Sequence, residues 1–213
     1  MLKRVIALAA IGAGAAWLSG CATMSEDQCM AGDWGAQGQS DGADGLPMSR
    51  LDEHAKACAK YQISPNEAAY ASARADGLRQ YCTRDRGFRE GREGDSYHGV
   101  CPAGAEAEFL PAYEDGRTVH EAVSAADSAR SSVNSYGSRL EDLDEKLDAK
   151  RGELRQEGLT DEQKQAIRNR IEEVRRERAD TERSWREAQE EADDAEDRAR
   201  SVRRRFERLY GSW

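Results

Sequence analysis

Two pairs of histidine and cysteine have spacings that could hold a metal ion. His54 comes four residues before Cys58, and His98 comes three residues before Cys101. Two imidazole nitrogens and two thiolates would suit tetrahedral zinc. The cysteines of this region are even in number, however, and could instead form two disulfide bonds. They are Cys29, Cys58, Cys82 and Cys101.

The first twenty residues indicate which of these chemistries applies. Lys3 and Arg4 are followed by an apolar run without a charge, residues 5–18, which is the layout of a secretory signal. This run is shorter than the about 20 residues that a membrane-spanning helix needs. The sequence therefore predicts a signal peptide over residues 1–20 and export to an oxidising compartment, where disulfides form. Of the three possible pairings we expect Cys29–Cys58 and Cys82–Cys101, because neighbours along the chain need no threading.

The apolar run ends in the letters LSGC, residues 18–21. This motif resembles the lipobox of bacterial lipoproteins, which is a leucine, two small residues and a cysteine. The resemblance implies cleavage between Gly20 and Cys21, a diacylglyceryl group on the Cys21 sulfur and acylation of the new amine. Ala22 follows the cysteine, and by lipoprotein sorting rules a residue other than Asp favours the outer membrane. The alternatives are an ordinary secretory signal with an accidental cysteine, or an uncleaved anchor.

Composition divides the rest of the chain near Thr118. All four prolines lie before this residue, and no proline follows it. We therefore expect residues 21–28 to form the lipidated cysteine and a linker, residues 29–117 a disulfide-bonded domain, and residues 118–213 a separate element. The net charge of −9 disfavours nucleic acid as a partner, because nucleic-acid binding needs clustered Lys and Arg.

Residues 118–213 carry two apolar rows with a seven-residue repeat, which is typical of a coiled coil. Gly158 suits a helix C-terminus, and Thr160 with Gln163 matches a capping box that opens a second helix. The sequence therefore predicts an antiparallel helical hairpin with its turn near residues 156–160. Large residues face large ones near the turn, and alanines face alanines near the base. We expect four C-terminal residues to pack on the disulfide-bonded domain: Phe206, Leu209, Tyr210 and Trp213.

Residues 29–117 predict a small, loop-rich α domain. Helices are expected over residues 50–61 and 65–81, and turns are expected at Gly87, Gly91, Gly94 and Gly99. Its ordered motifs are Trp-x-x-x-Gly, His-x-x-x-Cys, Gly-Leu-x-x-Tyr-Cys and Tyr-x-Gly-Val-Cys-Pro. In this order they resemble a family of small bacterial lipoproteins known only as a domain of unknown function. The resemblance implies no activity, and it does not extend to the hairpin predicted over residues 118–213.

The whole chain is therefore expected to be mainly α: a disulfide-bonded domain followed by a long antiparallel coiled-coil hairpin. We find no catalytic constellation, and we expect no metal and no cofactor. GFREGREG lacks the ending of a phosphate loop. His120 is expected to be solvated.

The function expected is that of an envelope lipoprotein, facing the periplasm, with a structural or interaction role as a tether, adaptor or assembly factor. The membrane, through Cys21, and an envelope protein, through the hairpin, are the expected partners. The alternative is a ligand-binding or enzymatic cleft around four residues: Trp34, His54, Tyr97 and His98. The rows beside the seam are compatible with either a monomer or a four-helix dimer.

Overall fold

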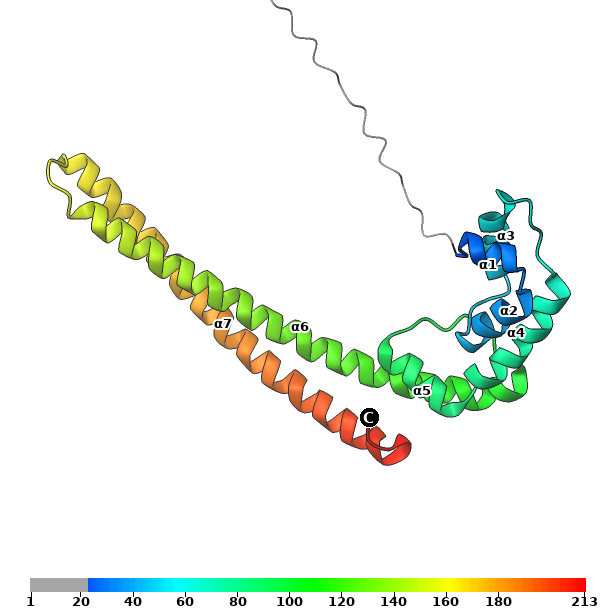
Figure 1. Cartoon of the computed structure of the whole chain (residues 1–213). Coiled ribbons are helices and arrows are strands. Elements are labelled where there is room, and N and C mark those ends of the chain that lie inside the picture. Colours follow the sequence, from blue (N-terminus) through cyan, green and yellow to red (C-terminus); the bar gives the residue numbers. More distant parts are fainter. Residues whose placement is uncertain (1–22) are drawn as a thin grey trace, which may run out of the picture.

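The computed structural model describes residues 23–213, and this part of the chain is helical without a strand. The signal peptide, the cleavage position and Cys21 lie outside the described residues. Short helices gather at one end, and two long helices extend away from them as a hairpin (Figure 1). The helices are α1 (Glu26–Ala31), α2 (Trp34–Ala43), α3 (Arg50–Ala59), α4 (Glu67–Tyr81), α5 (Arg84–Glu93), α6 (Ala103–Leu154) and α7 (Asp161–Tyr210). The mainly α fold and the long helical hairpin are confirmed.

Two helix pairs, α2 with α4 and α5 with α6, form the part that contains the disulfides. Their backbones meet at glycines. A Cβ atom added to Gly42 would lie 2.2 Å from the carbonyl oxygen of Arg74, and one added to Gly91 would lie 2.0 Å from that of Tyr113. Only residues without a side chain allow such an approach. Gly87 and Gly91 thus lie inside α5, so the expectation that they form turns is wrong. Gly94 and Gly99 have left-handed φ values of 84° and 66°, as expected of glycines at turns.

Both expected disulfides are present, and each lies in an apolar core of its own. Cys29 and Cys58 have Cα atoms 5.4 Å apart, and Cys82 and Cys101 have Cα atoms 5.6 Å apart. The first disulfide packs with Trp34 and other buried residues. The second packs with an aromatic group that includes Tyr81, Phe109 and Tyr113. Disulfides that close loops of this length stabilise a fold by about 3 kcal/mol each, which compensates for the small size of these cores.

Helix α6 crosses the boundary expected at residues 117 and 118. It begins directly after Pro102, contains Pro111, and continues for 52 residues to Leu154. Its first turns pack on α5, where Gly116 allows the close approach, and its later turns form the hairpin. The composition changes near Thr118 because the packing partner changes, while the helix itself continues.

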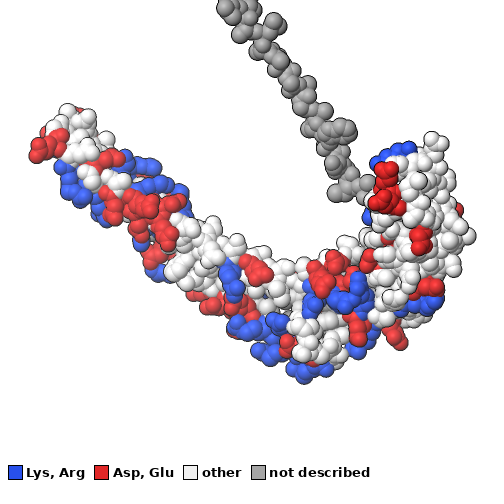
Figure 2. Space-filling view, viewed as in Figure 1, with Lys and Arg blue, Asp and Glu red and all other residues white. Residues whose placement is uncertain are grey.

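The hairpin follows the heptad prediction closely. Gly158 has a φ of 81°, and Thr160 and Gln163 form the capping box that begins α7. Leucine, isoleucine and valine are buried near the turn, and alanines are buried towards the base. Ion pairs bridge the two helices beside the seam, and Lys, Arg, Asp and Glu intermingle along the surface (Figure 2). The bridging pairs are Arg130–Glu196, Arg139–Glu177 and Arg178–Asp144.

The C-terminal aromatic residues attach the base of α7 to the short helices. Tyr210 stacks on Phe88 of α5 with ring centroids 4.0 Å apart, and its hydroxyl donates to Asp115 of α6 over 2.8 Å. Phe206 and Trp213 join the same core, whereas Leu209 is 52% exposed. Three of the four expected contacts are therefore made, and they place the hairpin at a defined angle to the disulfide-bonded part.

Candidate functional site

A buried carboxylate network occupies the first helix pair. Asp41 of α2, His54 of α3 and Tyr70 of α4 are almost completely buried. Oδ2 of Asp41 accepts hydrogen bonds from Nε2 of His54 over 2.7 Å and from the Tyr70 hydroxyl over 2.6 Å. Oδ1 of Asp41 accepts from the amide of Gln37 over 2.9 Å. Three donors therefore surround this carboxylate, and burial, with the hydrogen bond to Asp41, raises the pKa of Tyr70 so that its hydroxyl remains a donor.

The same network holds the first described residues of the chain. Nδ1 of His54 lies 2.8 Å from the hydroxyl of Thr23, and Met24 is buried in the first core. Ser25 then caps α1 through a capping box with Gln28. The linker expected over residues 21–28 is therefore wrong from residue 23 onward, because this stretch is packed, hydrogen-bonded structure. Sequence reasoning missed this, since no pattern in TMSED shows that a distant histidine contacts it.

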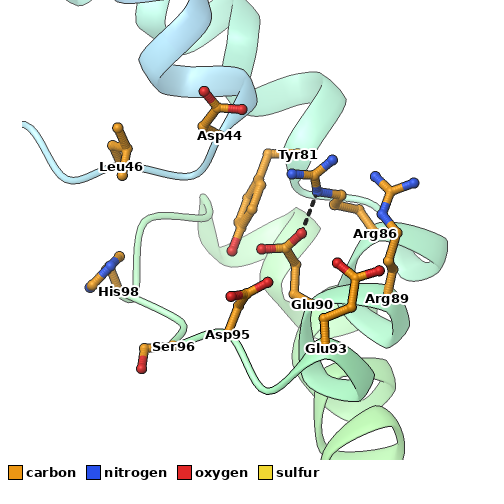
Figure 3. A pocket seen from close by; sticks show the side chains of 10 residues that line it. All are labelled: Asp44, Leu46, Tyr81, Arg86, Arg89, Glu90, Glu93, Asp95, Ser96 and His98. Atoms are coloured by element: carbon orange, nitrogen blue, oxygen red, sulfur yellow. Dashed lines mark ion pairs between the residues drawn. The ribbon is translucent and has the colours of Figure 1, made fainter.

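A second buried carboxylate, Glu90 of α5, faces an open pocket of about 350 Å³ (Figure 3). The pocket lies where the ends of α2, α4 and α5 meet the loop after α5. Its lining carries both signs of charge. The lining residues are Asp44, Leu46, Tyr81, Arg86, Arg89, Glu90, Glu93, Asp95, Ser96 and His98.

Glu90 is 7% exposed, which is unusual for a glutamate. Oε1 of Glu90 lies 2.7 Å from Nε of Arg86. Burial raises the pKa of Glu90, Arg86 opposes that shift and Asp95 adds to it. The carboxyl oxygens of Glu90, Glu93 and Asp95 lie within 4.8 Å of one another. Chemically, the site presents a partly desolvated carboxylate that gains from any positively charged or hydrogen-bond-donating group that enters.

The close helix crossings, the Cys82–Cys101 disulfide and both carboxylates lie in one stretch of the chain, and this stretch matches a family model. Residues 33–118 match the model of a family described as "Protein of unknown function (DUF2799)". The matched segment begins at the cap of α2 and ends within α6, so it includes Asp41, His54, Tyr70 and Glu90 and leaves out the rest of the hairpin. Neither a comparison with curated proteins nor one with solved structures found a match.

Within the matched segment, the four residues that were expected to share a cleft lie in different places. Trp34 packs in the first core, and His54 is fully buried beside Asp41. Tyr97 packs on Phe109 in the second core, and its hydroxyl donates to Glu106. Of the four residues, His98 alone lines the open pocket. The zinc alternative also fails, because Cys58 and Cys101 are in disulfides.

Sequence reasoning missed Glu90, although its surroundings carried a signal. The string GFREGREG was considered as a phosphate loop, but it is α5, and its glycines contact α6. A helix with glycines at every fourth residue predicts a close helix crossing, and a carboxylate adjacent to such a glycine must be near that crossing. His120, expected to be solvated, instead packs over Gly94, and its Nδ1 lies 3.2 Å from the carbonyl oxygen of Arg92.

Replacing Glu90 with glutamine is expected to raise the free energy of unfolding at neutral pH. A folded-state pKa above the unfolded value means that Glu90 favours folding at low pH and loses that contribution as the pH rises through the raised pKa. The neutral amide does not carry the burial penalty of the charge. Urea unfolding at pH 7 should therefore show Glu90→Gln more stable than the wild type, and the difference should vanish below about pH 4, near the ordinary pKa of glutamate. A less stable variant at pH 7 would show that the Arg86 ion pair outweighs the burial.

Proposed function

We propose that the chain is a lipid-anchored envelope protein that holds a rigid helical hairpin at a set distance from the membrane and presents it to an envelope partner. The observation that carries the proposal is the LSGC motif directly ahead of packed structure: one residue, Ala22, separates Cys21 from Thr23, which contacts His54. A lipid on Cys21 would therefore be joined to the folded domain through a single residue. None of the described helices is long and apolar enough to span a bilayer.

The hairpin supports the interaction role. At about 1.5 Å per residue, a helix with the length of α7 extends roughly 75 Å. A groove of about 550 Å³ lies near its turn, where Leu154 and Ile171 are flanked by arginines. Apolar area next to Arg side chains is typical of protein interfaces. This groove lies at the opposite end of α7 from the contact with α5, which suits a partner some distance from the anchor.

A photo-crosslinking residue at Gln165, in the groove, tests both halves of the proposal in the native envelope. With Cys21 intact, the chain should sediment with membranes, incorporate labelled palmitate and yield a discrete crosslinked adduct. With Cys21→Ser, the lipid attachment is lost, so the chain should appear in the soluble fraction and the adduct should fall at least about tenfold, because effective concentration at the membrane is lost.

The matched control places the same crosslinker at Glu187, an exposed position of α7 outside the groove. It should give the same membrane fraction and no discrete adduct. If the wild-type protein does not incorporate palmitate, the proposed lipid anchor is wrong. If the two crosslinker positions give equal adducts, the groove is not the binding site.

A further inference from the structure

The two helix pairs of the disulfide-bonded part are copies of one motif. Three glycines in and just after α2 reappear in the same order 49 residues later, in and just after α5. They make equivalent contacts: the glycines of the first two positions meet carbonyl oxygens of the partner helix, and the third has a positive φ and packs under a ring. The equivalent positions are Gly38 and Gly87, Gly42 and Gly91, and Gly45 and Gly94.

Hydrogen bonds around these glycines repeat as well, and they make Glu90 the counterpart of Asp41. The amide of Leu46 donates to the Asp41 carbonyl over 2.8 Å, and the amide of Asp95 donates to the Glu90 carbonyl over 3.0 Å. In both copies, a side chain of the partner helix donates a hydrogen bond to the carbonyl oxygen of the residue whose amide makes this bond, Leu46 or Asp95. Arg74 donates to Leu46 over 2.9 Å, and the Tyr113 hydroxyl donates to Asp95 over 2.8 Å.

The two counterpart carboxylates differ in how well they are hydrogen-bonded. In the first copy Tyr70 and His54 both donate to Asp41. In the second copy the position of Tyr70 is taken by Phe109, which makes the equivalent contact with Gly87 and has no hydroxyl. The segment that supplies His54 has no counterpart, because the chain from Asp95 to Phe109 is ten residues shorter than that from Leu46 to Tyr70, which is the length of α3.

Among the residues that the structure describes, the Glu90 side chain consequently has no aligned donor. Its side chain is 10% exposed and points into the pocket (Figure 3). Arg86, at the position equivalent to Gln37, approaches it, but the Nε–H of Arg86 has no aligned acceptor within residues 23–213. A nine-tenths buried carboxylate that has an ion-pair neighbour but no aligned protein donor can accept a hydrogen bond from a donating ligand that enters the pocket.

We propose that the pocket at Glu90 binds a small organic cation that carries N–H donors, such as an alkylguanidinium or alkylammonium group, at the place that His54 fills in the first copy. The pocket carries four carboxylates against two arginines, so its formal charge favours a cation. The donors would satisfy Glu90 as His54 satisfies Asp41. A volume of about 350 Å³ admits a small molecule.

Calorimetric titration of the full chain in detergent with methylguanidinium tests the proposal. The wild type should bind, and Glu90→Gln should bind about tenfold or more weakly, because a hydrogen bond to a charged group is lost. Asp95→Asn, at the exposed rim, should weaken binding only about threefold, as expected for an exposed charge pair. Tetramethylammonium has the charge without an N–H and should bind more weakly than methylguanidinium.

Glu108→Gln is the matched control, since Glu108 is an exposed glutamate of α6 outside the pocket, and it should bind as the wild type does. The proposal is overturned if the wild type does not bind methylguanidinium, or if Glu90→Gln binds it equally well. It is also overturned if tetramethylammonium binds as tightly, or if calcium binds in place of the organic cation, since the three clustered carboxylates would then form a divalent-cation site. Circular dichroism verifies that each variant is folded, and Asp95→Asn supplies the test should Glu90→Gln unfold.

Discussion

Gly91→Ala is expected to lower the free energy of unfolding by about 3 kcal/mol, at the upper end of the cost of overpacking. The added methyl carbon would lie 2.0 Å from the carbonyl oxygen of Tyr113 and 2.8 Å from the amide nitrogen of Arg117. Both atoms belong to the backbone of α6, so no side-chain rotation relieves the clash. Helices α5 and α6 must separate, which also loosens the core around Phe109.

Gly137→Ala is the control, with an expected effect of the opposite sign. Gly137 lies in the middle of α6, and its nearest contact would be Nε1 of Trp185 at 3.8 Å, which is ordinary van der Waals distance. Alanine should therefore stabilise the helix by about 1 kcal/mol, because glycine loses more backbone entropy on folding. Thermal unfolding of both variants gives the comparison. If Gly91→Ala unfolds at the wild-type temperature, the close crossing of α5 and α6 is wrong.

Asp41→Ala is expected to destabilise the fold by about 3 to 5 kcal/mol, as observed when one member of a buried charged network is removed. The change leaves the buried donors of His54 and Tyr70, and the half-buried amide of Gln37, without their acceptor. Each unsatisfied buried donor costs about 1 to 3 kcal/mol. Because His54 also contacts Thr23, the N-terminal residues should lose their attachment as well. Urea unfolding measures the first effect, and protease cleavage near Thr23 reports the second.

Two further variants test whether the loss of stability comes from the buried network and not from any change of a polar residue. Tyr70→Phe removes one donor and leaves Asp41 two others, so it should cost about 1 kcal/mol. Asp76→Ala removes an exposed aspartate whose ion-pair partner is Arg79, and it should change stability by less than about 0.5 kcal/mol. If Asp41→Ala costs no more than Asp76→Ala, the network does not hold the first helix pair together.

The link from Asp41 through His54 to Thr23 connects the stability of the fold with its proposed position at the membrane. A lipoprotein with a flexible tether can take many orientations relative to the bilayer. Here one residue, Ala22, lies between the proposed lipid site and the first contact. Packing at Met24, the contact of Tyr81 with Phe109 and the stacking of Phe88 on Tyr210 give a series of buried contacts from Thr23 to the hairpin.

Local and periodic signals in the sequence were sufficient for the hairpin and its turn. A seven-residue repeat, a capping box at Thr160 and a left-handed glycine at Gly158 each depend on residues close together in the chain. The sequence left three disulfide pairings open, and the structure shows the pairing of sequential neighbours that was expected. The leader and the LSGC motif carry the expectation of a lipid anchor in the same local way.

Only the tertiary structure decided what the buried polar groups do. Gly87 and Gly91 read as turn residues until α6 is seen to pass over them, and Thr23 reads as a linker until His54 is seen beside it. Glycines and acidic residues recur at a 49-residue spacing, but this short repeat alone does not show that Asp41 and Glu90 are equivalent, because one copy lacks the segment that supplies His54. The physical reason is that the environment of a carboxylate depends on donors from distant helices, and the pattern around each residue does not show which donors reach it.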